Sequence, residues 1–244
     1  SKDIYRIPAT GGTPVRLTSH PGNETPMTVL LDGNIIFSAN IQQDARYGDF
    51  PGRSQVYMIG PEGGRPEMVT SMQISNMSVR LDNTVIFEDY KGYEDPLRKH
   101  HTSSVTRDIW MYVPSKDPSE DFSIDGNGTF TKLTSFNGED RNPVFELGGN
   151  AYYYLSEQDG TLNIYYTDSL ADQLFNGGSI KSKQITFYKG NPVRYLSISH
   201  NGTLCYSYDG ELYTIKSGGQ PEKVNIRIVT DQIEKESEIQ TLTS

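Results

Sequence analysis

The chain has 244 residues, enough for one large all-β domain, and its 16 tyrosines and 9 phenylalanines supply the large side chains that sheets favour. The formal net charge is −9 and there is no long basic run, so we expect no nucleic-acid partner. No stretch approaches the ~20 apolar residues of a membrane helix, so we expect no membrane span.

The first 24 residues predict a single β-hairpin. A strand around Tyr5 leads to the turn Gly11-Gly12, and a second short strand ends at Leu17-Thr18. This phrase combines a strand containing Tyr or Trp, a Gly-rich or polar turn, and a strand ending near Leu-Thr. Further copies occupy residues 55–70, 108–134 and 163–186, with a diverged copy at 211–219.

A second repeated sequence motif precedes each of these later copies. It is a turn of Asp, Asn and Gly residues followed by a strand of alternating pattern, and it occupies residues 31–38, 81–87, 147–156 and 200–207. The turn residues supply the positive φ angles that tight hairpins require. Two hairpins per repeat predict a four-stranded antiparallel unit.

The repeat predicts an all-β fold, a β-propeller of about six blades when complete. A lone four-stranded sheet cannot bury both faces, so neighbouring sheets must stack around an axis. We expect an incomplete ring of four full blades plus part of another: 1–24 (partial), 25–73, 74–139, 140–191 and 192–232. Because an open ring leaves bare sheet edges, we expect residues before Ser1 in the natural chain to supply the missing strands. Residues 233–244 read as a linker to missing downstream domains.

An insertion at residues 89–107 is the candidate interaction loop. It is a long connection that bears several Lys, Arg and His residues within an acidic protein, and long loops on rigid scaffolds are where binding tends to lie. An ordered flap that packs on its own blade is the alternative. The candidate residues are Tyr90, Lys91, Tyr93, Arg98, Lys99, His100, His101 and Arg107.

No catalytic, cofactor-binding or metal-binding residue is predicted. The four histidines, His20, His100, His101 and His200, are spread over three blades, and no His-Glu-x-x-His or Gly-x-Ser-x-Gly motif is present. Acidic pairs such as Glu139-Asp140 read as solvated or capping groups beside turns. The single Cys205 lies in an apolar alternation and reads as a buried structural thiol.

The insertion also carries a family resemblance. Residues 90–110, from Tyr90-Lys91-Gly92-Tyr93 to Arg107-Asp108-Ile109-Trp110, resemble the Lys-Gly-Tyr to Arg-x-Ile-Trp segment of tricorn-like serine proteases. Segments 131–143 and 205–213 resemble blades of the same family, and the repeats are similar more broadly to TolB-type propellers.

The resemblance implies that the chain is the first propeller of a tricorn-like serine peptidase whose catalytic domain lies elsewhere in the parent protein. The chain itself would then be non-catalytic and would shape the access or assembly of peptide substrate. Its partners would be peptide in transit or other domains of the same protein, and an oligomer of the parent protein is left open. The repeat style favours a bacterial periplasmic or secreted setting over a cytoplasmic one.

Two alternatives stay open. One is a TolB-like protein-binding propeller at the cell envelope, which would have no peptidase domain downstream. The other is a propeller polysaccharide lyase, which would need several histidines to converge at the mouth of the axis.

Overall fold

The computed structural model describes residues 2–8, 10–41, 54–93, 102–115, 122–146, 148–175, 181–216 and 218–226. Within these residues the strands form one two-stranded and four four-stranded antiparallel sheets, so the all-β prediction is confirmed. The short helix α1 (Leu170–Phe175) lies between two strands. No helix in the described part of the chain is long and apolar enough to cross a membrane.

In every sheet the strands pair in chain order. The hairpin consists of β1 (Tyr5–Arg6) and β2 (Val15–Arg16). Sheet I consists of β3 (Glu24–Val29), β4 (Ile35–Ala39), β5 (Gln55–Ile59) and β6 (Glu67–Thr70), and sheet II of β7 (Ile74–Val79), β8 (Val85–Asp89), β9 (Ile109–Val113) and β10 (Thr129–Lys132). Sheet III consists of β11 (Asp140–Phe145), β12 (Tyr152–Ser156), β13 (Asn163–Thr167) and β14 (Ser182–Gln184), and sheet IV of β15 (Arg194–Ile198), β16 (Leu204–Tyr208), β17 (Glu211–Ile215) and β18 (Glu222–Lys223).

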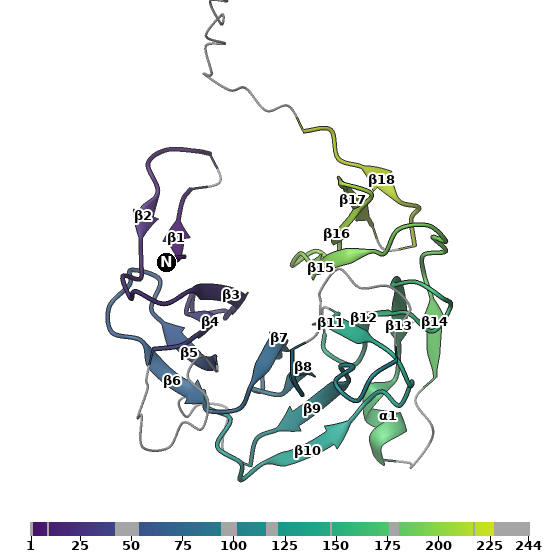
Figure 1. Ribbon diagram of the computed structural model, residues 1–244, viewed down its shortest axis with the longest axis horizontal. Helices are drawn as coiled ribbons and strands as arrows, with labels where there is room; N and C mark the ends of the chain where they lie inside the picture. Colours follow the sequence, from purple (N-terminus) through teal and green to yellow (C-terminus); the bar gives the residue numbers. More distant parts are fainter. Residues whose placement is uncertain are drawn as a thin grey trace, which may run out of the picture.

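The four sheets stand side by side along an arc (Figure 1). The first strand of each sheet is the innermost, and β7 contacts both β3 and β11, while β11 also contacts β15. The arc is open between the β1–β2 hairpin and sheet IV (Figure 1). This arrangement confirms a propeller with an incomplete ring.

The β1–β2 hairpin has the bonding pattern of the outer two strands of a blade. The Ile4 backbone N–H donates to the Thr18 hydroxyl at 2.9 Å. The same bond joins Ile109 to Thr134 in sheet II, at 3.0 Å, and recurs at the end of sheet III. Three equivalent bonds explain why the phrase ends on Leu-Thr or Ile-Thr, because the hydroxyl satisfies a buried backbone donor there.

The hydrophobic cores lie between adjacent sheets. Ile36 of sheet I packs with Phe87 and Tyr112 of sheet II, and each is at most 2% exposed. A second core joins sheets II and III, and a third joins sheets III and IV. Full burial of each such side chain stabilises the fold by about 1.5–3 kcal/mol, so each sheet depends on its neighbours.

Several expectations fall outside the described residues. They are those for Arg98, Lys99, His100 and His101 of the insertion, and for the linker at 233–244.

Candidate functional site

A cavity of about 160 Å³ lies on the axis of the arc. Among the residues that the structure describes, those that line it all belong to the innermost strands of the four sheets, and none of them is charged. The lining residues are Met27 and Thr28 of β3, Asn76, Met77 and Ser78 of β7, Asn142, Pro143 and Val144 of β11, and Leu196, Ser197 and Ile198 of β15.

The sequence brings these residues together because the four innermost strands align without a gap. Met27, Met77, Pro143 and Leu196 occupy one equivalent position, directly followed by Thr28, Ser78, Val144 and Ser197. Each innermost strand also carries a register shift against its neighbour. Such bulges bend a strand and change the direction of its side chains, which is why consecutive residues line the cavity.

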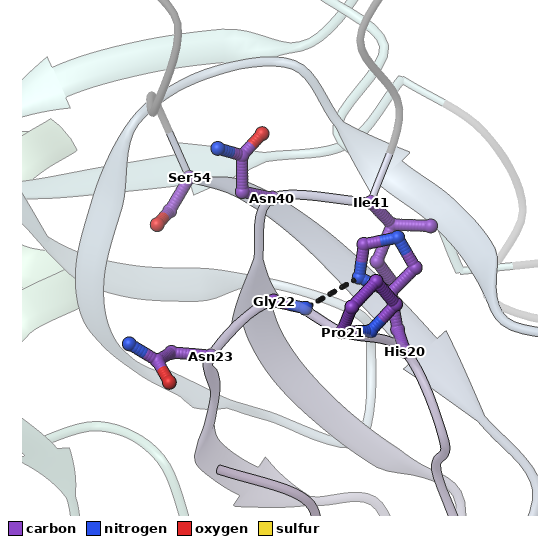
Figure 2. Close-up of a pocket in the computed structure, with 7 residues that line it drawn as sticks. All are labelled: His20, Pro21, Gly22, Asn23, Asn40, Ile41 and Ser54. Carbon is purple, nitrogen blue, oxygen red and sulfur yellow. Dashed lines mark hydrogen bonds between the residues drawn. The ribbon is translucent and has the colours of Figure 1, made fainter. Parts of the chain in front are cut away.

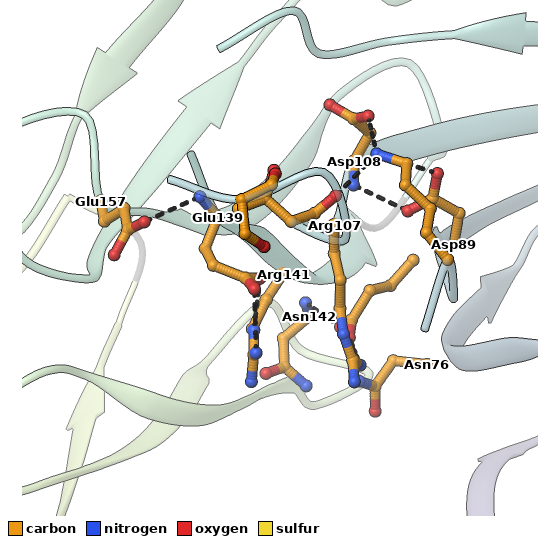
Figure 3. Close-up of polar contacts among 12 residues, drawn as sticks. Asn76, Asp89, Arg107, Asp108, Glu139, Arg141, Asn142 and Glu157 are labelled. Atoms are coloured by element: carbon orange, nitrogen blue, oxygen red, sulfur yellow. Dashed lines mark hydrogen bonds and ion pairs between the residues drawn. The ribbon is translucent and has the colours of Figure 1, made fainter. Parts of the chain in front are cut away.

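A buried carboxylate fixes two of the lining residues. Glu88 is 0% exposed and its Oε2 accepts hydrogen bonds from Asn76 Nδ2 at 2.7 Å and from the backbone N of Asn142 at 3.0 Å. Arg107 pairs with the other oxygen, Oε1, and compensates the buried charge. Asn76, Asn142 and Arg107 lie close together in Figure 3.

Beside this group lies a second buried ion pair. Arg141 Nε is 2.7 Å from Oε2 of Glu139, and the backbone N of Glu139 donates to Glu157 Oε1 (Figure 3). Burial lowers the pKa of Arg141, but the hydrogen bond and charge of Glu139 outweigh it, so the pKa is raised. Within each of the two pairs, the positive and the negative charge balance.

The prediction for Glu139 and Asp140 was wrong. These side chains are 2% and 1% exposed, because they stand where sheet II passes into sheet III and neighbouring strands cover them. Neither oxygen of Asp140 accepts a hydrogen bond of good geometry from the residues that the structure describes. Burial is the main reason that its pKa is raised to about 7; the hydroxyls of Ser156 and Thr134 only partly oppose this.

The two ends of the insertion are fastened to each other. Lys91 Nζ donates to the Thr106 carbonyl at 2.6 Å and pairs with Asp108. Asp89 accepts hydrogen bonds from the backbone N of Asp108 and from the Trp110 indole. These contacts close the base of the loop.

The candidate interaction residues of the insertion therefore differ in what they contact. Lys91 and Arg107 are engaged in ion pairs within the chain, and the Arg107 guanidinium lies 5.3 Å from the centre of the Tyr90 ring. Tyr93 is 82% exposed. That this loop binds a partner stays a prediction.

A second, open hollow of about 600 Å³ lies at the connection between β2 and β3. Figure 2 shows the ring of His20 beside it, with Nδ1 accepting a hydrogen bond from the Gly22 backbone N at 3.0 Å. His200 is in the turn between β15 and β16 of another sheet and is not among the described residues that line this hollow. In the described part of the chain, no three His, Cys, Asp or Glu side chains are grouped to hold a metal ion.

The thiol of Cys205 is free and partly rather than fully buried. Cys205 lies on β16 opposite Ser197 of β15, on the face of sheet IV that turns away from the core. The prediction of a buried thiol is therefore corrected: the Cys205 side chain is half-buried.

The family comparison agrees with this architecture. Residues 1–220 match the model of the tricorn protease N-terminal β-propeller domain. The chain belongs to this family. Most of its length, including all four sheets up to β17, falls within the match.

Solved structures show the same fold at low identity. The tricorn protease crystal structure is 19% identical with a TM-score of 0.69, covering 95% of this chain and 20% of that chain. The putative TolB from Agrobacterium tumefaciens is 18% identical with a TM-score of 0.58, covering 90% of this chain and 72% of that one. TolB from Acinetobacter baumannii is 18% identical with a TM-score of 0.59, covering 91% and 48%. Among curated proteins, none matches.

The propeller domain thus spans about a fifth of the tricorn protease chain that it resembles. Sequence reasoning named its repeats but missed Asn76, Glu88 and Asn142, the group at the axis. The gapless alignment of the four innermost strands is the signal that could have found Asn76 and Asn142. No local pattern marked Glu88, which contacts a residue 54 positions away.

Proposed function

We propose that this propeller is the non-catalytic module of a tricorn-like serine peptidase and that it controls the passage of extended peptide along its axis. One observation carries the proposal: residues from all four sheets line one cavity on the axis, and none of them is charged. An uncharged lining suits a chain that must move on, because it offers no strong ion pair that would hold a passing segment.

The membership in the tricorn N-terminal propeller family supports this proposal, since the tricorn protease is by its name a peptidase. The serine nucleophile would then lie outside these 244 residues. We further propose a bacterial periplasmic or secreted setting, which fractionation of cells that express the intact protein would test.

The experiment is a plug placed in the axis of the intact protein. Ser197→Trp puts a large ring into the cavity, whereas Glu222→Trp puts the same ring on the exposed outermost strand of the same sheet. We expect Ser197→Trp to slow the hydrolysis of a long unfolded polypeptide at least severalfold relative to Glu222→Trp. Equal rates for the two variants would contradict passage along the axis.

Protein binding through the insertion is the second candidate function. The observation in its favour is Tyr93, which is 82% exposed on a loop whose base is fastened. In a pull-down, Tyr93→Ala should lose a stoichiometric partner if this function holds. Retention of the partner, or its absence with the wild-type protein, would remove it.

A further inference from the structure

We infer that the axial cavity is a binding site for the backbone of a short, uncharged, extended peptide segment. In this site Asn142 contacts the peptide group and Glu88 is a positioning residue. The inference rests on the proposed function, because it concerns the peptide segment that the cavity binds while a longer chain passes along the axis.

The chemistry of the lining sets the class of ligand. In the part of the lining that the structure describes, all side chains are hydroxyl, carboxamide, thioether or hydrocarbon groups. A charged side chain in this cavity would lose water without gaining an ionic partner, which is costly. The volume of about 160 Å³ equals the share of roughly five water molecules, so it holds a short stretch of chain and not a folded element.

The polar lining groups differ in whether they are already engaged. The Ser78 hydroxyl accepts a hydrogen bond from the Phe145 backbone N at 3.1 Å, and the Ser197 hydroxyl donates to the Cys205 carbonyl. Asn76 gives its amide N–H to Glu88. The carboxamide of Asn142 makes no hydrogen bond to any residue that the structure describes, and it retains a donor and an acceptor.

A free carboxamide is the complement of a peptide unit. It can accept from a backbone N–H and donate to a backbone C=O, whichever side chains the segment carries. The oxygen of the Asn76 amide adds an acceptor from the neighbouring strand, because Glu88 engages only the nitrogen and no other described residue donates to the oxygen. Together they recognise backbone and not sequence, which suits a passage for varied peptides.

Glu88 determines where these amides stand. Its Oε2 holds Asn76 through the side chain and Asn142 through the backbone N. Asn142 has a φ of 47°, a left-handed conformation that Asn tolerates better than most residues. The carboxylate therefore fixes a backbone conformation that directs the Asn142 side chain, without itself lining the cavity.

The test measures peptide binding to the intact protein after treatment with a serine-reactive sulfonyl fluoride, so that turnover does not interfere. The probes are a fluorescent, terminally blocked peptide of Gly, Ala and Ser, the same peptide with N-methylated backbone amides, and versions with a central Lys or Glu. Fluorescence anisotropy gives each affinity. We expect the uncharged parent peptide to bind more tightly than the other three.

Asn142→Gly is the decisive variant, because Gly adopts positive φ readily and keeps the backbone N–H while the carboxamide is removed. Its matched control is Asn83→Gly, the same substitution at φ 61° in the half-buried turn between β7 and β8, away from the cavity lining. We expect Asn142→Gly to weaken binding of the parent peptide about three- to tenfold, as one or two hydrogen bonds would. Asn83→Gly should leave the affinity for the parent peptide unchanged. The affinity for the N-methylated peptide should be the same in the wild-type protein and in Asn142→Gly. Equal effects of the two variants, or equal affinity for the methylated and parent peptides, would overturn the inference.

The positioning role of Glu88 has its own readout. Glu88→Gln should weaken peptide binding in the wild-type background but add nothing once Asn142 is Gly, because it acts through that residue. Additive effects on binding would assign Glu88 a structural role only.

If the wild-type protein binds no peptide while Ser197→Trp still slows hydrolysis, the binding site is wrong and passage stands. If peptide binds as described and Ser197→Trp changes nothing, passage is wrong and the site stands.

Discussion

The Glu88 carboxylate accepts a hydrogen bond from the backbone N of Asn142, 3.0 Å away, across the junction between sheets II and III. Arg107 pairs with the same carboxylate, and its side chain is only 12% exposed. The ion pair that fixes this strand at the axis of the propeller is therefore buried inside the protein and does not lie on the protein surface. Removal of one partner leaves the other as an uncompensated buried charge.

We predict that Glu88→Gln lowers the free energy of unfolding by about 3 kcal/mol, because the buried Arg107 loses its partner. Urea denaturation followed by circular dichroism measures the change. Glu62→Gln is the control, since Glu62 pairs with Arg6 on the exposed surface. The control should unfold like the wild-type protein. Equal loss in both variants would show that burial does not govern this pair.

Asp140 should make stability fall as the pH rises. Burial raises its pKa to about 7 in the folded protein, whereas the pKa of an unfolded Asp is near 3.8. Between these values the folded state holds a proton that the unfolded state has released, so unfolding becomes easier from about pH 4 to pH 7 and levels off above. We predict that Asp140→Asn, which cannot ionise, is more stable than the wild-type protein at pH 8 by about 2–4 kcal/mol.

The same comparison at pH 4 should bring the Asp140→Asn and wild-type proteins close together, because the side chain at position 140 is then neutral in both folded proteins. Urea midpoints at several pH values supply the data. A constant difference between the two proteins across this range would show that Asp140 does not titrate in it.

The hydroxyl of Thr186 should contribute more to stability than an ordinary strand threonine. It accepts a hydrogen bond from the Ile164 backbone N at 2.8 Å and donates to Asn163 Oδ1 at 3.0 Å, and it is 2% exposed. Thr186→Val keeps the shape and leaves a buried N–H without a partner, which costs about 1–3 kcal/mol. Thr131→Val, on the half-buried strand β10, is the control and should cost less. The thermal unfolding midpoints of both variants measure this difference. Equal shifts of the two midpoints would contradict a special stabilising role for the Thr that ends the repeat.

The isolated 244-residue chain should hydrolyse no peptide, whereas the intact protein should do so through a serine outside it. A fluorogenic peptide assay on both preparations at equal concentration measures this. Loss of the activity on sulfonyl fluoride treatment identifies the serine type. Turnover by the isolated chain would overturn its assignment as non-catalytic.

The fold could be predicted because its signals are local. Turns of Asp, Asn and Gly at fixed places, such as Gly33 at φ 87° and Gly202 at φ 79°, and strands that end on Leu-Thr recur within short windows of sequence. Helix α1 was not predicted, since its six residues are too few to show a helical period.

The site could not be predicted in the same way, because its contacts are long-range. Glu88 and Asn142 meet only when two sheets pack, and nothing near either residue in the sequence indicates the other. Glu139 and Asp140 resemble a solvated turn in sequence, and only the crossing from sheet II to sheet III buries them. The insertion stood out in the sequence for its Lys, Arg and His residues, but two of its cations, Lys91 and Arg107, form ion pairs within the chain.

The most direct test of the central claim is site-specific photo-crosslinking in the intact protein. A diazirine analogue of leucine, which is much smaller than the Trp ring of the plug, replaces Ser197 on the axis in one preparation and Glu222 on the outermost strand in another, and each is irradiated during turnover of a long unfolded polypeptide. If peptide passes along the axis, position 197 forms crosslinks to the substrate and position 222 does not. Crosslinks at position 222 alone, or at neither position while substrate is being cleaved, would contradict the account.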